Sequence, residues 1–265
     1  MKIGFIGCGN MASAIIKGII SAEEIDSKDI LVFDTYSPAC ETAKNHFGVT
    51  ILNSECEVAE KADIVFLAVK PNIISAVSKK ITDAVMEKQP LIVSIAAGKT
   101  LDFIESSIGI EARIIRVMPN INAKVGEAIS AYCFNNNVGD KDKENIEILL
   151  NCIGKVICLD ESSFPLFGVL GGCAPAYAYM FIDALARAGV KNGMKKDDAL
   201  KIAAQTVYGS AKMILESDEH PYKLIDNVCS PGGTTIEGVI SLQADGFESA
   251  VHNAVDKALD KDKKL

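Results

Sequence analysis

Short runs of apolar residues recur through the first half of the chain and alternate with stretches that have helical spacing. Uninterrupted runs of this kind suit strands that are buried on both faces of a parallel sheet. The expected strands are Ile3–Ile6, Ile30–Phe33, Ile64–Val69, Leu91–Ile95 and Ile114–Met118. The expected helices begin after Asn10 and cover Pro38–Phe47 and Asn72–Met86. Strands that alternate with helices predict βαβ units and an α/β fold with a doubly wound sheet.

The second half of the chain has a different pattern. After a further strand-like run at Val156–Leu159, the apolar residues follow helical spacing. The expected helices are Pro175 to about Val190, Asp197 to about Glu216, a short one near His220–Asn227, Thr234–Leu242 and Phe247–Lys261. This change places a domain boundary near Glu161, between an α/β domain of residues 1–160 and an all-helical domain of residues 161–265.

One uncharged segment has the length of a membrane span. No residue from Ser162 to Ile182 is charged, and about 18 apolar residues can be enough to cross a bilayer. The segment also contains Pro165, Pro175 and several glycines. We therefore expect a buried helix that is entered through a small-residue turn, in a soluble protein without a membrane partner.

Composition narrows the class of protein. The 265 residues are 49% hydrophobic and 23% charged, which supplies a sizeable core and excludes a disordered chain. The net charge of −8 disfavours nucleic acid as a partner, because an acidic surface repels phosphates. The eight cysteines form no Cys-x-x-Cys pair and there are three histidines, so no metal site is expected. Cysteines of this kind and the lack of a signal-peptide pattern favour a cytoplasmic location.

A glycine-rich turn directly follows the first expected strand. It reads Gly7-Cys8-Gly9-Asn10-Met11-Ala12 and opens the first expected helix. In a dinucleotide-binding turn the first glycine permits the tight bend, the second admits the pyrophosphate, and the small third residue allows the helix to pack closely on the strand. The helix N-terminus adds partial positive charge. The alternative is an ordinary strand–helix turn, but the position within a βαβ unit favours a Rossmann-like cofactor site.

Asp34 ends the second expected strand, where such folds place a carboxylate that binds the adenosine ribose. A carboxylate there accepts from both ribose hydroxyls of NAD and repels the 2′-phosphate of NADP. The next residue is Thr35 and no arginine follows, so the residues favour NAD. A helix-capping or turn aspartate is the alternative interpretation.

Two later strands end in small residues, at Ala68-Val69-Lys70-Pro71 and at Ala96-Ala97-Gly98. In a doubly wound sheet, ligands lie across the carboxyl ends of the strands at the crossover point. Small residues there leave room for a nicotinamide ring, and Lys70 is a candidate to face the cofactor or the substrate. A surface lysine before a proline-started helix is the alternative for Lys70.

The stretch Asp226–Gly238 is the most unusual in the chain. It contains Ser230-Pro231-Gly232-Gly233-Thr234-Thr235 immediately before an expected helix. Such a turn exposes several backbone N–H groups at a helix N-terminus, which can bind a carboxylate or a phosphate. A helix cap formed by Thr234 or Thr235 is the alternative.

Together these motifs resemble the pyrroline-5-carboxylate reductase family, and the resemblance runs from end to end. The matching segments are Ile6–Ala12, Leu67–Pro71, Arg116–Asn120, Val125–Glu127, Pro175–Tyr177, Ala188–Val190, Ala203–Val207 and Asp226–Thr235. The last of these is highly specific, whereas the first is shared by many dehydrogenases.

The resemblance implies an oxidoreductase that reduces 1-pyrroline-5-carboxylate to L-proline with NADPH or NADH, the last step of proline synthesis. It implies that Gly232, Gly233 and Thr234 bind the substrate carboxylate through their backbones. Thr235 would act as a catalytic residue at the ring nitrogen, with Lys70 as the second catalytic candidate. Glu161 would contact the substrate nitrogen, and Asn227 would contact the cofactor.

The resemblance also implies a homodimer, built on the helical domain, that assembles further. The active site would draw Asp226–Thr235 from the partner subunit.

The chain departs from the family pattern at Gly171-Gly172-Cys173-Ala174, at Ile121-Asn122 and at Thr35. Two alternatives remain. One is another β-hydroxyacid-type dehydrogenase or imine reductase, which would use Lys191, Lys195 or Lys196. The other is a non-catalytic redox sensor that binds NAD(P).

Overall fold

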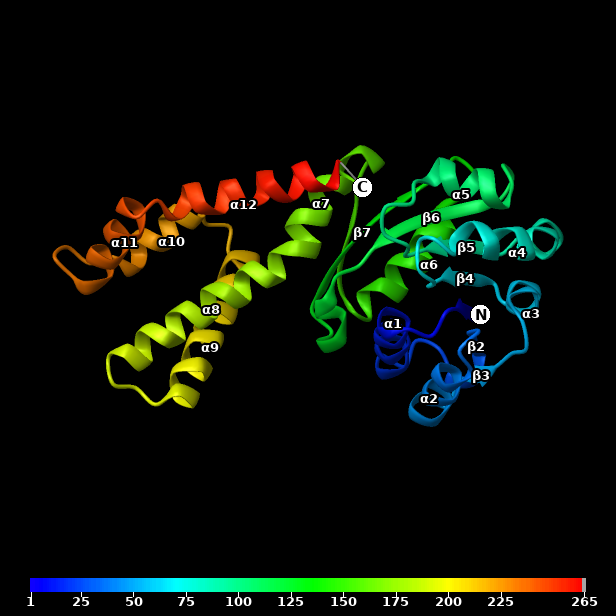
Figure 1. The fold of residues 1–265 in the computed structure, drawn as a ribbon, viewed down its shortest axis with the longest axis horizontal. Helices are drawn as coiled ribbons and strands as arrows, with labels where there is room; N and C mark the ends of the chain where they lie inside the picture. Colours follow the sequence, from blue (N-terminus) through cyan, green and yellow to red (C-terminus); the bar gives the residue numbers. More distant parts are fainter. Residues whose placement is uncertain (264–265) are drawn as a thin grey trace. The chain divides into compact units, whose positions relative to one another are not determined.

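The computed structural model describes residues 1–263, and its contacts divide the chain into two compact units (Figure 1). The first unit is Met1–Gly172 and the second begins at Cys173. The first unit contains a single eight-stranded sheet with the strand order β3-β2-β1-β4-β5-β6-β7-β8. Its strands are β1 (Ile3–Ile6), β2 (Ile30–Phe33), β3 (Thr50–Ile51), β4 (Ile64–Leu67), β5 (Leu91–Ser94), β6 (Arg113–Met118), β7 (Ala128–Phe134) and β8 (Gly154–Cys158).

The sheet is mostly parallel, and its strand order reverses next to β1. β1 pairs in parallel with both β2 and β4, so the chain builds outward in one direction through β2 and β3 and then in the other through β4, β5 and β6. β6 and β7 are antiparallel, whereas the other paired strands are parallel. The expected doubly wound sheet is confirmed, and its crossover point lies between β1 and β4.

Helices cover both faces of this sheet. Their bounds are α1 (Asn10–Ser21), α2 (Ser37–Phe47), α3 (Glu55–Lys61), α4 (Ile74–Lys88), α5 (Leu101–Ile108), α6 (Asp140–Asn151) and α7 (Phe164–Phe167). Apolar residues of α1, α2 and α6 pack with Phe5 and Phe66 in one core. Those of α3, α4 and α5 pack with Ile6 and Leu67 in a second core. Neighbouring residues of one strand thus point into different cores, which explains why these strands are apolar at every position.

Single turns complete the first unit. They are η1 (Ser27–Asp29), η2 (Ile121–Val125), η3 (Glu161–Ser163) and the π-helical turn η4 (Gly168–Cys173), which reaches the boundary between the units.

The apolar pattern predicted the central strands well and the outer elements poorly. β1 and β2 have the expected bounds, and β4, β5, β6 and β8 lie within two residues of theirs. Sequence reasoning missed β3, α3, α5, β7 and α6. β3 has two residues, β7 mixes apolar residues with small and polar ones, and α6 begins with Asp140-Lys141-Asp142-Lys143. Such segments carry little periodic signal.

The described part of the second unit is helical. It comprises α8 (Ala174–Lys191), α9 (Lys196–Glu216), α10 (Pro221–Val228), α11 (Thr234–Ala244) and α12 (Phe247–Asp262), close to the expected ranges. α8 and α9 form a hairpin whose small core is Ala186, Ala199 and Ala203. Many large apolar side chains of this unit remain exposed, among them Met180 at 72% and Leu215 at 82%. Such a surface is typical of a protein interface.

The uncharged segment does not form a buried helix within one chain. Glu161–Lys191 is helical and apolar enough to cross a membrane by length and composition, and 11% of its most apolar window is buried. The expectation of burial is therefore wrong for the isolated chain, because the helical unit is too small to cover this surface.

The stacked pair Phe5 and Phe66 tests the first core. Both side chains are fully buried, and their ring centroids lie 4.7 Å apart. We expect Phe66→Ala to lower the free energy of unfolding by about 3–5 kcal/mol, because it removes a buried ring and leaves a cavity. Urea-induced unfolding measures this change. The control Ile110→Ala, at an 80% exposed position, should change it by less than about 0.5 kcal/mol; equal effects of the two variants would contradict the packing described.

Candidate active site

Gly7 and Ala68 lie close together at the crossover point of the sheet. Gly7 follows β1 with a φ of +104°, and a Cβ atom added to it would lie 2.6 Å from the carbonyl oxygen of Ala68. Ala68 follows β4, and its N–H donates to the Ile6 carbonyl at 2.9 Å. Only glycine fits this position, because both the backbone angle and the space exclude a side chain. The bend directs the chain away from the sheet and into α1.

The N-terminus of α1 is open to a ligand. Gly9 is its N-cap residue, and apart from Gly9 and its neighbours along the chain, no atom of the described residues lies within 4 Å of the position that a Cβ atom would take there. Among the described residues, no side chain caps this helix and no acidic residue lies in its first turn. Ala12 is 1% exposed and packs against the core. Free N–H groups and the helix dipole at an open glycine fit the pyrophosphate of a dinucleotide.

Asp34 is held in place by two backbone groups. Its Oδ2 accepts from the Cys8 N–H at 2.8 Å, and its Oδ1 accepts from the Tyr36 N–H at 2.8 Å. The carboxylate therefore connects the glycine-rich turn to the end of β2. Each oxygen retains capacity to accept another hydrogen bond, so the position remains suited to ribose hydroxyls.

Cys8 has a packing role in the turn. Its Sγ lies 3.8 Å from the Sγ of Cys40, and both residues are buried. Burial raises the pKa of the Cys8 thiol far above its ordinary value, and the neighbouring Cys40 adds to the effect. The thiol remains protonated at neutral pH and is therefore a poor nucleophile.

A cavity of about 110 Å³ lies beside Asp34 at the carboxyl ends of β1, β2 and β4. Four predicted site residues contribute to its lining: Gly7, Asp34, Thr35 and Val69. The other lining residues, which sequence reasoning missed, are Ile6, Phe33, Glu55, Ile73, Ala76, Val77 and Lys80. Ile73, the N-cap residue of α4, and Ala76, Val77 and Lys80 within α4 have the spacing of one helical face, which is the sequence signal that could have found them.

The remaining cofactor candidates of the first unit lie at the ends of β4 and β5. Ala96 is buried, whereas Ala97 and Gly98 are exposed, so small residues border the sheet there. Lys70 is exposed and Pro71 is half-buried. The roles of these residues stay predictions.

Glu161 is engaged in contacts within the first unit. Its Oε1 accepts from Arg116 Nη1 at 2.8 Å and from the Leu101 N–H at 2.8 Å. Arg116 is buried, with 8% of its side chain exposed, and it also lies over the Phe164 ring at 4.4 Å. The carboxylate therefore neutralises a buried cation and caps α5, in addition to its predicted contact with the substrate nitrogen.

The other substrate candidates lie together in the second unit. The turn from Ser230 to Gly233 joins α10 to α11, and the Gly233 N–H donates to the Ser230 carbonyl at 3.0 Å. Gly232 has a φ of +67°, and Thr234 and Thr235 are the first exposed residues of α11. Within residues 1–263, no side chain caps this helix. Its first-turn N–H groups are free to bind an anion, and Asn227 lies exposed at the end of α10.

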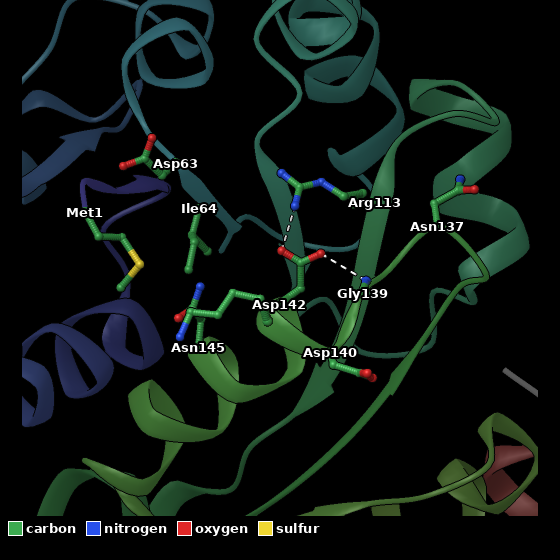
Figure 2. A pocket seen from close by; sticks show the side chains of 10 residues that line it. Met1, Asp63, Ile64, Arg113, Asn137, Gly139, Asp140, Asp142 and Asn145 are labelled. Atoms are coloured by element: carbon green, nitrogen blue, oxygen red, sulfur yellow. Dashed lines mark hydrogen bonds and ion pairs between the residues drawn. The ribbon is translucent and has the colours of Figure 1, made fainter.

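A second pocket lies at the opposite, amino ends of the strands (Figure 2). It contains the ion pair between Arg113 and Asp142, at 2.6 Å, and Asp142 also accepts from the Gly139 N–H at 3.1 Å (Figure 2). No predicted site residue lines this pocket. Arg113, Asp142 and the Gly139 N–H thus satisfy one another, and Asp142 caps α6.

The contacts of Glu161 lead to a stability prediction. We expect Glu161→Gln to lower the free energy of unfolding by about 1.5–3 kcal/mol, because the buried Arg116 loses its counter-charge. Urea-induced unfolding measures the loss, and Asp160→Asn is the matched control, since Asp160 is exposed and caps nothing through its side chain. An unchanged free energy of unfolding in Glu161→Gln would show that the ion pair does not stabilise the fold.

Comparisons with known proteins agree with this geometry. The family model for pyrroline-5-carboxylate reductase dimerisation matches residues 161–265. The model described as NADP oxidoreductase, coenzyme F420-dependent, matches residues 2–98. The first unit is therefore an NAD(P)-binding domain, and the helical region that follows is a dimerisation region, to which the exposed apolar side chains belong.

Relatives match over the full length. The pyrroline-5-carboxylate reductase of Escherichia coli is 43% identical over 265 residues, covering 100% of this chain and 98% of the relative. The solved enzyme from Coxiella burnetii has a TM-score of 0.94 at 32% identity and covers 99% of this chain and 97% of that one. The enzyme from Plasmodium falciparum, solved with NADP bound, has a TM-score of 0.87 at 34% identity and covers 100% and 97%. The chain belongs to the pyrroline-5-carboxylate reductase family.

Proposed function

We propose that this member of the family reduces 1-pyrroline-5-carboxylate to L-proline with a hydride supplied by NADPH or NADH, the last step of proline synthesis. The observation that carries the proposal is 43% identity to a reductase over the whole chain. Two open helix N-termini, at Gly9 and at Gly233, support it. Each suits one anion: the cofactor pyrophosphate or the substrate carboxylate.

In this proposal residues 1–160 hold the cofactor. Gly7–Ala12 bind the pyrophosphate, and Asp34 and Thr35 lie at the adenosine ribose. Ala68–Pro71 and Ala96–Gly98 border the nicotinamide, where small side chains let the reacting face approach the substrate. Asn227 contributes a further cofactor contact. Hydride transfer needs alignment more than acid–base chemistry, because the carbon of a cyclic imine is already electrophilic.

Residues 161–265 hold the substrate and form the dimer. The backbone N–H groups of Gly232 and Thr234, with others of the first turn of α11, bind the carboxylate. The Gly233 N–H, which closes the turn onto Ser230, shapes this site and is available to the anion only if the turn opens.

Thr235 and Lys70 are the proposed catalytic residues. The Thr235 hydroxyl donates to the ring nitrogen, which gains electron density as the hydride arrives at the adjacent carbon, and the Lys70 ammonium adds positive charge near the same site. Glu161 has a second oxygen, Oε2, for the substrate nitrogen, while its Oε1 remains on Arg116 and Leu101.

We further propose that the dimers assemble into a higher homo-oligomer in the cytoplasm. The eight cysteines, all within the described residues, are free, which fits a reducing compartment. The alternative of another dehydrogenase or an imine reductase loses support, because Lys191, Lys195 and Lys196 are all exposed at the end of α8 and the start of α9, on either side of the loop that joins these helices.

A steady-state assay with 1-pyrroline-5-carboxylate and each reduced nicotinamide tests the function, and Thr235→Ala tests the site. We expect kcat to fall about a hundredfold in this variant with a smaller change in KM, because the lost hydrogen bond matters most in the transition state. Thr235→Ser, which keeps the hydroxyl, should retain most of the activity. Ser241→Ala removes an exposed hydroxyl further along α11 and should match the unchanged enzyme. Full activity of Thr235→Ala would remove the role given to Thr235.

The dimer can be tested at Met180, which lines an apolar cavity of about 530 Å³ between α8 and α12. Light scattering should give the unchanged protein at least twice the chain mass of 28.3 kDa. Met180→Asp should shift the mass toward that of one chain and lower activity, because a charge is costly in an apolar interface. A fully active monomer would contradict the proposal that the dimer builds the active site.

A further inference from the structure

We infer that the cavity beside Asp34 selects the 2′-hydroxyl of NADH and rejects the 2′-phosphate of NADPH. This inference rests on the proposed function and names the preferred cofactor of the same site. The P. falciparum relative has NADP bound, so the preference would be a property of this cavity rather than of the family fold.

The first argument is that the Asp34 carboxylate cannot turn away from the ribose. Two N–H groups hold its two oxygens at 2.8 Å, one from Cys8 in the glycine-rich turn and one from Tyr36. Rotation would break both charge-assisted bonds. The remaining lone pairs can accept hydroxyl protons, whereas a phosphate at neutral pH presents only acceptors and negative charge.

The second argument is the charge of the other lining residues. Glu55 is buried at 7% exposure and begins α3. Its Oε1 accepts from Lys80 Nζ at 2.8 Å. Among the described residues that line the cavity, Lys80 is the single cation and Asp34 and Glu55 are the two carboxylates. The lining therefore carries a formal net charge of −1, and its cation is already paired.

The third argument is the placement of the arginines, whose guanidinium groups are the usual partners of a phosphate. The chain has three: Arg113, Arg116 and Arg187. Arg113 pairs with Asp142 at the opposite ends of the strands (Figure 2). Arg116 pairs with Glu161, and Arg187 pairs with Asp183 on α8. In the part of the chain that the structure describes, none of the three lines the cavity.

The expected discrimination follows from like-charge repulsion. A 2′-phosphate beside the fixed Asp34 carboxylate meets a charge of the same sign at partly solvated contact distance, which lowers the affinity for the cofactor about tenfold. Because this term is electrostatic, it weakens when added salt shortens the Debye length.

The experiment is a calorimetric titration of the whole enzyme with ADP-ribose and with 2′-phospho-ADP-ribose, two probes that lack the nicotinamide and so report binding without turnover. We expect ADP-ribose to bind about tenfold more tightly in dilute buffer. The ratio of the two affinities should decrease as the salt concentration rises from about 0.05 M to about 0.5 M. In steady-state assays, kcat/KM should likewise be higher for NADH than for NADPH in dilute buffer, and this difference should also decrease as salt is added.

Variants assign the discrimination to residues. Asp34→Ser should remove most of the preference, because it deletes the fixed charge. Glu55→Gln should improve binding of the 2′-phosphate probe several-fold, because Lys80 loses its counter-charge and can turn to the phosphate. Glu60→Gln is the matched control: Glu60 lies on the same helix, is exposed and is outside the cavity, so the preference should remain.

The outcomes separate the two proposals. Equal or tighter binding of the 2′-phosphate probe to the unchanged enzyme overturns the NADH preference and leaves the proposed function standing. Binding of neither probe overturns the cofactor site, and the preference with it. The Asp34→Ser variant could unfold, because the Asp34 carboxylate also holds the glycine-rich turn. In that case the unchanged enzyme and Glu55→Gln still test the cofactor preference. An unchanged preference in both variants overturns the role of the cavity.

Discussion

The structure of the first unit depends on one close backbone contact, between the turn after β1 and the end of β4. Ile6 and Leu67 are paired in register, so the residues that follow them meet at the crossover point of the sheet. A side chain on Gly7 would collide with the Ala68 carbonyl. Because Gly7 has no side chain, the chain can bend directly after β1 and pass into α1, which packs in one core, while the chain after β4 passes into α4 in the other. The crevice that we propose for the cofactor is the space between the segments that leave β1 and β4.

The two proposed anion sites share one feature, although they lie in units with different folds. α1 and α11 each begin after a glycine, and in residues 1–263 neither has a capping side chain. α3 and α5 are capped by Ser54 and Thr100, whereas α12 also begins after a glycine, Gly246, without a side-chain cap, so the proposed sites rest on the neighbouring motifs as well. An N-terminus without a cap leaves donors unsatisfied, and this cost is tolerable where a ligand supplies the acceptor. The reductase chemistry of the family needs two such ligands, a dinucleotide and a small carboxylate.

Sequence reasoning found what is encoded locally. The β-branched runs of β1, β2 and β4 and the glycine-rich turn could be read because strand, bend and helix follow within a few residues. The residues that line the cavity beside Asp34 could not be predicted in this way. Glu55 and Lys80, for example, are separated by 25 positions and meet only through the packing of α3 on α4. Likewise the partner of Glu161 is 45 residues away on β6. Arg116 lies within the expected buried strand Ile114–Met118, but nothing near it in the sequence identifies the carboxylate that pairs with it. At the turn from Ser230 to Thr235, the residues themselves predicted only that an anion could bind. The substrate and the roles of individual residues were predicted from the family resemblance.

Glu161 connects the region that matches the dimerisation model to the nucleotide-binding unit. The dimerisation family model begins at this residue, yet its carboxylate binds Arg116 on β6 and the first amide of α5, three residues beyond Gly98. The first residue of the region that matches the dimerisation model thus stabilises the nucleotide-binding unit from within. A chain cut after residue 160 would have an orphaned guanidinium inside its sheet. A boundary drawn at residue 160 therefore cuts through a contact of the first unit, which extends to Gly172.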